Sequence, residues 1–347
     1  MKRFFVLLII LLLLPSFPVY AQFGKNKIQY DNFEWYFIQS KHFDVYYYPG
    51  AEKLAEFTAE EAEIAYERLK RDFSYEIKDR VVIIIYKSHN DWQQTNVVLP
   101  FLEEGIGGVT ELYKNRIVVP FEGSYEQFRH VIHHELVHGV MNDLLYGGSV
   151  QALLMREVVP VPIWVSEGLA EFESTGWDTN TDMIVRDAVL SDWIPPVQYL
   201  EYILAYQGGN SVFRYIAETY GREKIGEILL KSRGNIGFQQ VLLSSIGLDY
   251  EGLTDKWHRY LQKIYSPEVN NRLVPKEFSE QLTNHKKLNN FLNLSPAITP
   301  QGDKIAYISD RAGYQNIYLM SAIDGKEIKT LVKGQRSESF EELHFLR

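Results

Sequence analysis

Hydrophobic and polar positions near the start of the chain alternate with a period of two, which predicts a set of β-strands. Apolar and polar side chains alternate between Trp35 and Tyr48, as they do in a strand with one buried face. Val81 to Tyr86 is a continuous, mostly β-branched run, typical of a strand that is buried on both faces. Gly105 to Val119 is expected to form two short strands, joined near Lys114 and Asn115.

Longer segments follow the helical period instead. Ala51 to Phe73 is rich in Ala and Glu and carries one apolar stripe, which predicts a long helix. Tyr125 to Leu145 and about Ile163 to Glu173 are also expected to be helices. From Tyr199 to about Tyr265 the pattern is mostly helical and is punctuated by four glycine positions, Gly208-Gly209, Gly221, Gly234 and Gly247.

Beyond Ser266 the composition becomes polar, and after Asn293 the period of two returns. Ile305 to Ile308 and Ile317 to Met320 are predicted strands. We therefore expect an α+β domain over residues 22–266, with a mixed sheet and an active-site helix followed by a mostly helical part. A linker over residues 267–293 and a short all-β piece over residues 294–347 would follow it.

The first 21 residues are typical of a signal peptide. Lys2 and Arg3 precede an unbroken apolar run from Phe4 to Leu14, which is short for a membrane span, and Ala21 offers a small residue for cleavage. The alternative is an uncleaved N-terminal anchor. We expect export to the periplasm, the outer membrane or the medium, with no transmembrane helix left after signal removal. The chain has no Cys, which excludes lipoprotein acylation and disulfides.

The charge of the chain argues against a nucleic-acid partner. The formal net charge is −9, and removal of Lys2 and Arg3 with residues 1–21 makes it −11. Because affinity for phosphate backbones comes mainly from clustered cations, and the chain has no such cluster, binding to nucleic acid is not expected.

The chemistry is concentrated in the helix predicted from Tyr125, which carries the pattern H-E-x-x-H at residues 134–138. His134 and His138 are four residues apart, so they lie on one helical face and can bind one Zn²⁺. Glu135 is offset by one residue and is placed to take a proton from a water that the zinc acidifies. The same pattern can arise by chance in a charged helix, so the surrounding sequence matters.

A catalytic zinc site needs a third protein ligand, and Glu167 in the next predicted helix is the best candidate. Glu171 lies four residues further along the same face, where it can accept a hydrogen bond from the second ring nitrogen of a ligating His. The apolar residues around these two glutamates make a fully exposed helix a poor alternative. Asp143, Glu157 and Glu171 remain other candidates for the third ligand.

The H-E-x-x-H pattern followed by W-x-x-E-G-x-A-E-F at residues 164–172 resembles the gluzincins, the thermolysin- and aminopeptidase-like peptidases of the MA clan, and in particular the peptidase MA-like domains of exported bacterial proteins. The resemblance covers roughly Phe37 to Tyr265. It implies one Zn²⁺ per chain, held by His134, His138 and Glu167, with Glu135 as the general base and a peptide or protein as substrate. One departure is the 28 residues between His138 and Glu167, which is more than in the best-known gluzincins.

Two further features come from this resemblance alone. Gluzincins pair an edge strand with the substrate backbone, and the segment Gly107-Gly108-Val109-Thr110 lies at the corresponding place, although it also suits an ordinary turn or bulge. They also use a Tyr or His to stabilise the oxyanion, and Tyr206 occupies a similar position after the third-ligand helix.

His130 and His133 are interpreted as ordinary helix residues or as supports behind a ligand.

The last predicted strands resemble another family. Residues 294–311, with their continuation over 316–320, are similar to one blade of TolB-type β-propellers. One blade cannot bury its own faces, so the resemblance implies a fragment of a longer protein, with the propeller serving recognition; a small β appendage is the alternative.

Three classes of function fit these features. The first is an exported zinc-dependent metallopeptidase. The second is a catalytically silent module with a peptidase fold, which binds or assembles partners in the cell envelope. A third is a surface scaffold that binds carbohydrate or protein, which only the aromatic content of 14% and the propeller-like tail suggest. Because the chain keeps His134, Glu135, His138 and Glu167 together, the hydrolase is favoured.

Overall fold

The computed structural model describes residues 31–96, 107–112, 114–147, 161–174, 176–234, 236–269, 272–273, 275–290, 292–313 and 315–334. The proposed signal peptide lies outside these residues. The chain divides into two compact units, the first ending at Arg259 and the second beginning at Tyr260. None of the helices in the described ranges is long and apolar enough to cross a membrane.

The first unit begins with the mixed sheet that the sequence predicts. Its five strands lie in the order β1-β2-β3-β5-β4. β2, β3 and β5 are parallel in the centre, and β1 and β4 are antiparallel to their neighbours at the two edges. The strand bounds are β1 Tyr36–Gln39, β2 Phe43–Tyr47, β3 Val81–Tyr86, β4 Val109–Thr110 and β5 Ile117–Pro120.

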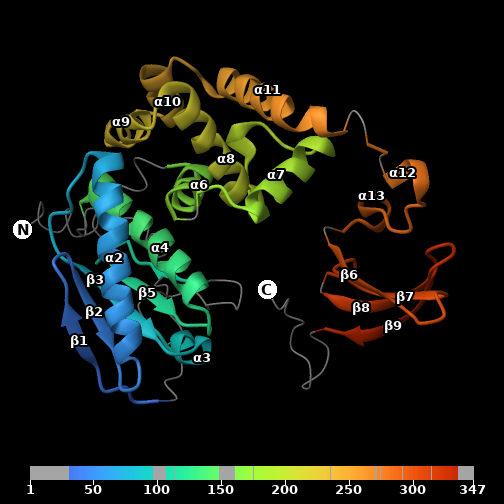
Figure 1. Ribbon diagram of the computed structural model, residues 1–347, viewed down its shortest axis with the longest axis horizontal. Helices are drawn as coiled ribbons and strands as arrows, with labels where there is room; N and C mark the ends of the chain where they lie inside the picture. Colours follow the sequence, from blue (N-terminus) through green and yellow to red (C-terminus); the bar gives the residue numbers. More distant parts are fainter. Residues whose placement is uncertain are drawn as a thin grey trace, which may run out of the picture. The chain divides into compact units, whose positions relative to one another are not determined.

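Two long helices, α2 (Glu52–Phe73) and α4 (Tyr125–Tyr146), lie side by side against the sheet (Figure 1). The short α3 (His89–Gln93) packs on β3 and β5. α4 has clear local signals at both ends. The Ser124 side chain accepts a hydrogen bond from the Gln127 backbone at its start, and Gly147 adopts a φ of +72° at its end, where a side chain would be strained.

α4 is tied to α2 by a buried ion-pair group. Glu61 of α2 is nearly inaccessible to solvent and contacts two side chains of α4. One oxygen accepts a hydrogen bond from Arg129 Nε at 2.8 Å, and the other lies 3.1 Å from His133 Nε2. A buried carboxylate is tolerated only with such partners, so these contacts set the position of α4 along α2.

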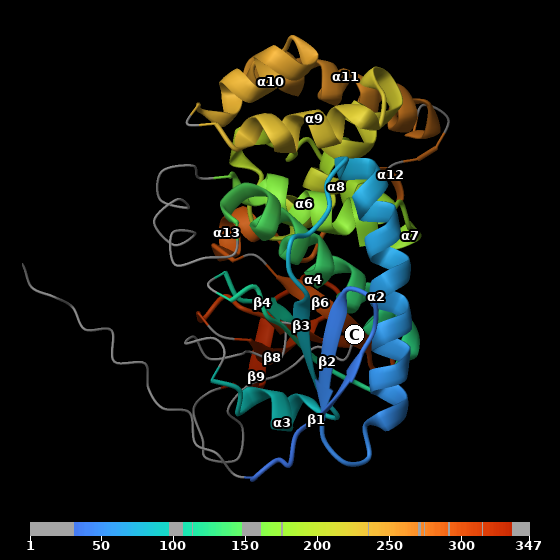
Figure 2. The same cartoon turned by 90° about the vertical axis from the view of Figure 1, so that its left-hand side faces the viewer.

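The rest of the first unit is helical, and Figure 2 shows α6, α8, α9 and α10 stacked as a layer beyond the sheet. The bounds are α6 Ile163–Ser174, α7 Thr179–Leu190, the 3₁₀ turn η1 Val197–Tyr199, α8 Ile203–Tyr220, α9 Glu223–Ser232, α10 Phe238–Ile246 and α11 Tyr250–Val269. α7 and α3 were not predicted from the sequence. α11 continues past Arg259 into the second unit.

Gly208 and Gly209 do not interrupt α8, in contrast to Gly221 and Gly247, which end helices. Gly209 is where α8 crosses α6. A methyl group on Gly209 would lie 2.5 Å from the Trp164 carbonyl oxygen, and one on Gly168 would lie 2.4 Å from Gly209 Cα. Only glycine on both helices allows this approach, so the crossing sets the distance between α6 and α8.

The second unit contains an antiparallel sheet of four strands in the order β6-β7-β8-β9. Tyr307, Tyr318 and Met320 form its small core, with Leu282 and Ile305 packed against them. Two short helices lie within the residues expected to be a linker. The bounds are α12 Pro275–Phe278, α13 His285–Leu288, β6 Asn293–Ile298, β7 Lys304–Ser309, β8 Asn316–Ser321 and β9 Glu327–Lys333. The resemblance to a propeller blade stays a prediction.

Candidate metal centre

Three side chains from two helices converge at the point where α6 meets α4. His134 and His138 come from successive turns of α4, and Glu167 comes from α6. The two Nε2 atoms are 3.2 Å apart. Glu167 Oε2 lies 3.4 Å from His134 Nε2 and 3.3 Å from His138 Nε2. The donor atoms therefore form a nearly equilateral triangle.

This triangle has the dimensions of one face of a zinc tetrahedron. Ligand atoms at about 2.0–2.1 Å from a tetrahedral Zn²⁺ are roughly 3.3–3.4 Å from one another. Two imidazole nitrogens and one carboxylate oxygen are also a common donor set of catalytic zinc, which keeps its fourth position open. The chemistry and the spacing of the three residues thus fit a catalytic zinc ion.

The electrostatics of His134 and Glu167 show how strongly the site favours a cation. Burial alone would lower the pKa of His134, but the carboxylates of Glu167 and Glu171 outweigh it and raise that pKa to about 10. Burial would raise the pKa of Glu167, yet the His134 and His138 rings hold it far below the usual value of a carboxyl. In the absence of metal, a proton on His134 therefore supplies the positive charge, and a metal ion must displace it.

Glu171 supports His134 from the side opposite to the triangle. Its Oε1 lies 3.0 Å from His134 Nδ1, although the ring N–H is not aimed straight at that oxygen. Because Glu171 is four residues after Glu167, both carboxylates project from the same face of α6. Glu171 thus favours the tautomer of His134 that carries its proton on Nδ1 and directs the Nε2 lone pair into the triangle.

Glu135 is held at the edge of the site by the strand β4. The Thr110 hydroxyl donates a hydrogen bond to Glu135 Oε2 at 2.6 Å and lies 3.0 Å from the main-chain oxygen of the same residue. A methyl group on Gly108 would lie only 2.8 Å from Glu135 Cγ. Gly108 therefore leaves room for Glu135 of α4, because it has no side chain on that side. The Thr110 hydroxyl holds one oxygen of the Glu135 carboxylate in place.

The other two residues of the predicted edge segment have different surroundings. A methyl group on Gly107 would meet Val131 of α4 at 3.2 Å. Val109 points to the opposite face of the sheet from Thr110, as alternation requires, and packs against the buried cluster around Trp92. Within the described residues β4 is the last strand of the sheet, so one of its edges has no neighbouring strand.

Tyr206 of α8 also reaches the site. Its ring lies nearly parallel to that of His134, with ring centroids 6.1 Å apart. Burial and the nearby charges of Glu167 and Glu135 raise its pKa well above that of a free tyrosine. At neutral pH its hydroxyl is consequently a hydrogen-bond donor and not a phenolate.

The alternative ligands and the neighbouring histidines are placed elsewhere. Asp143 Oδ2 accepts hydrogen bonds from the Tyr75 hydroxyl at 2.8 Å and from the Lys78 backbone at 3.1 Å, away from the triangle. Glu157 lies outside the described residues. His133 faces Glu61, as described above, and His130 faces Glu171. No pattern in the sequence indicates the contacts of Thr110 with Glu135 or of Glu61 with α4, whereas His130 is interpreted there as an ordinary helix residue or a support behind a ligand.

Comparison with known proteins identifies the family of the chain. A family model described as Peptidase MA superfamily matches residues 59–263, more than half of the 347 residues. The match contains α4, α6 and α8, which carry the site. No curated protein matches the chain.

Proposed function

Because the chain belongs to the Peptidase MA superfamily, we propose that it is an exported, zinc-dependent metallopeptidase that hydrolyses peptide bonds in peptides or proteins. The observation that carries this proposal is the triangle of His134, His138 and Glu167, whose edges of 3.2–3.4 Å suit one zinc ion. Glu135 beside the triangle supplies a group that can move a proton.

The roles of the residues follow from their positions. Zinc, when bound, would polarise the scissile carbonyl and lower the pKa of a water molecule. Thr110 donates to Oε2 of Glu135, which leaves Oε1 as the oxygen that accepts a proton and later delivers it to the leaving amine. Tyr206, whose hydroxyl stays protonated, would donate a hydrogen bond to the oxygen that becomes negative in the transition state.

The substrate would bind along β4. The Glu111 backbone N–H donates to the carbonyl oxygen of Arg116, just before β5, at 2.8 Å, so by alternation the N–H and C=O of Thr110 point to the outer edge of the sheet. An extended peptide can pair with that edge, which places its backbone beside Glu135. This arrangement agrees with the role of the segment Gly107-Gly108-Val109-Thr110 that the resemblance implies.

Metal analysis and chelation test the proposal directly. The purified chain is expected to contain about one zinc per molecule, and removing it with a chelator should abolish hydrolysis of casein or of a peptide library. Adding one equivalent of zinc should restore hydrolysis, while magnesium, which prefers oxygen ligands, should not. A chain that holds zinc and cleaves none of these substrates would instead support the catalytically silent binding module.

Thr110 offers a test of how the base is held. Thr110→Val keeps the shape of the side chain and removes the hydroxyl, so we expect kcat to fall by about tenfold, or ~1.4 kcal/mol, with KM nearly unchanged. Thr110→Ser restores a hydroxyl and should recover most of the rate. Zinc content should be equal in both variants, and an equal kcat in both would show that the hydroxyl does not act on Glu135.

A further inference from the structure

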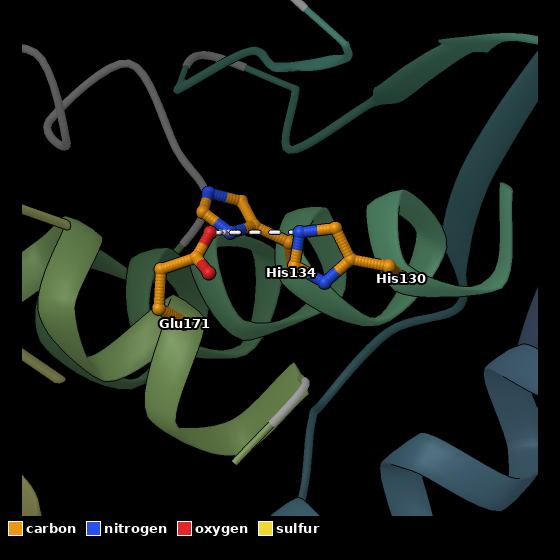
Figure 3. Close-up of side chains that lie close together, drawn as sticks. All are labelled: His130, His134 and Glu171. Carbon is orange, nitrogen blue, oxygen red and sulfur yellow. Dashed lines mark ion pairs between the residues drawn. The ribbon is translucent and has the colours of Figure 1, made fainter. Parts of the chain in front are cut away.

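His130 contacts Glu171, the carboxylate that also contacts His134. His130 lies one turn before His134 on the same face of α4, and both rings point towards Glu171 of α6 (Figure 3). His130 Nε2 is 3.5 Å from Glu171 Oε1, the same oxygen that lies 3.0 Å from His134 Nδ1. The two rings are edge to face, with centroids 5.9 Å apart. One carboxylate oxygen is thus flanked by two imidazoles.

The surroundings of Glu171 make this second contact matter. Glu171 is only 8% exposed, so its negative charge depends on nearby partners. The Nδ1–H of His134 is not aimed straight at Oε1. His130 approaches the same oxygen from the preceding turn of the helix.

We propose that His130 is a positioning residue of the metal centre, which holds the Glu171 carboxylate against His134 and so keeps the His134 lone pair directed at the metal. This inference rests on the proposed zinc site and extends it by one residue. Outer partners of a ligating histidine commonly change metal affinity by about 10–100-fold when they are replaced. His130 reaches the metal centre through Glu171 and through the edge of the His134 ring, so its effect should be at the lower end of that range.

A different reading of the same three residues is a second metal site, because their donor atoms also lie close together. It would require His134 to bind one ion through each ring nitrogen. The ring would have to lose its Nδ1 proton, and with it the contact to Glu171, while two cations stood on opposite sides of one imidazole. The arrangement of one ion with a supporting histidine is therefore favoured.

Three variants of the full chain test the proposal. His130→Leu removes the ring nitrogens, His130→Gln keeps an N–H donor near the place of Nε2, and Gln127→Leu is a control at an exposed position of the same helix. Zinc affinity is measured by competition with a chromogenic chelator, and unfolding of the metal-free proteins is measured by circular dichroism. We expect zinc affinity to fall on the order of tenfold in His130→Leu, and to stay near the unchanged chain in the other two.

The outcomes separate the possibilities. Equal zinc affinity in His130→Leu and the unchanged chain would overturn the proposal, as would an equal loss in the Leu and Gln variants. Two zinc ions per unchanged chain, falling to one in His130→Leu, would establish the second metal site instead. If His130→Leu unfolds without metal, the Gln variant carries the test, and a tenfold loss in it overturns the proposal. Because these measurements need no substrate, they stand apart from any failure to detect hydrolysis.

Discussion

Glu135→Gln is expected to lower the rate of peptide hydrolysis by about 10²–10⁴-fold while one zinc ion stays bound. Glutamine has nearly the same shape as glutamate and can still accept the hydrogen bond from Thr110, so the helix and the metal triangle should be preserved. It cannot take up a proton from water at neutral pH, and the step that needs a base is lost. The measurements are zinc content and kcat/KM with a fluorogenic peptide.

Glu126→Gln is the matched control for this substitution. It makes the same chemical change on the first turn of α4, where Glu126 is exposed. Its rate should equal that of the unchanged chain. If Glu135→Gln also kept the full rate, Glu135 would not be the base, and the assignment of the whole centre as a hydrolase would fail.

The second large effect is expected from Gly209→Ala. Its methyl group would lie 2.5 Å from the Trp164 carbonyl oxygen and 2.7 Å from Gly168 Cα, and neither backbone atom can move without separating α6 from α8. We expect the free energy of unfolding to fall by about 3 kcal/mol. Zinc affinity should fall as well, because Glu167 is displaced from the two imidazoles. Denaturant unfolding and chelator competition measure the two effects.

Gly208→Ala tests whether the crossing is responsible. Its methyl group would meet a side-chain methyl of Leu200 at 2.9 Å, and not a backbone atom. A side chain can shift, and alanine favours the helix by about 1 kcal/mol over glycine, so the net change in stability should be small. If both variants lost a similarly large amount of stability, any larger side chain at this part of α8 would be destabilising, and the crossing with α6 would not be the cause.

Local patterns were sufficient to predict the main elements. The helices from Glu52, Tyr125 and Ile163 and the strands β2, β3 and β5 follow from the period of the hydrophobic pattern, which is set over a few positions of the chain. The proximity of His134 and His138 follows from helix geometry in the same way. The family match to residues 59–263 supports the peptidase-like fold that the motifs suggested.

Contacts between distant segments could not be predicted in this way. No local rule brings His138 and Glu167 together across the 28 residues between them. Glu167 was predicted from the need for a third ligand and from the family resemblance. The contacts of Thr110 with Glu135 depend on how β4 packs against α4, which no local pattern specifies. Gly208-Gly209 was interpreted as a break in the helix. A glycine pair inside a helix that continues on both sides is better interpreted as a close helix crossing.

The anchoring of α4 by Glu61 has a mechanical consequence for the metal centre. Because α2 and α4 are joined through a buried carboxylate and pack on the sheet, the two imidazoles belong to the part of the unit built on the sheet, whereas Glu167 and Tyr206 belong to the helical layer. Arg222, which pairs with Asp72 of α2 and with Glu173 of α6, already ties this layer to α2. An ion held by all three donors would join the two parts at one further point, at the place where the catalytic groups lie.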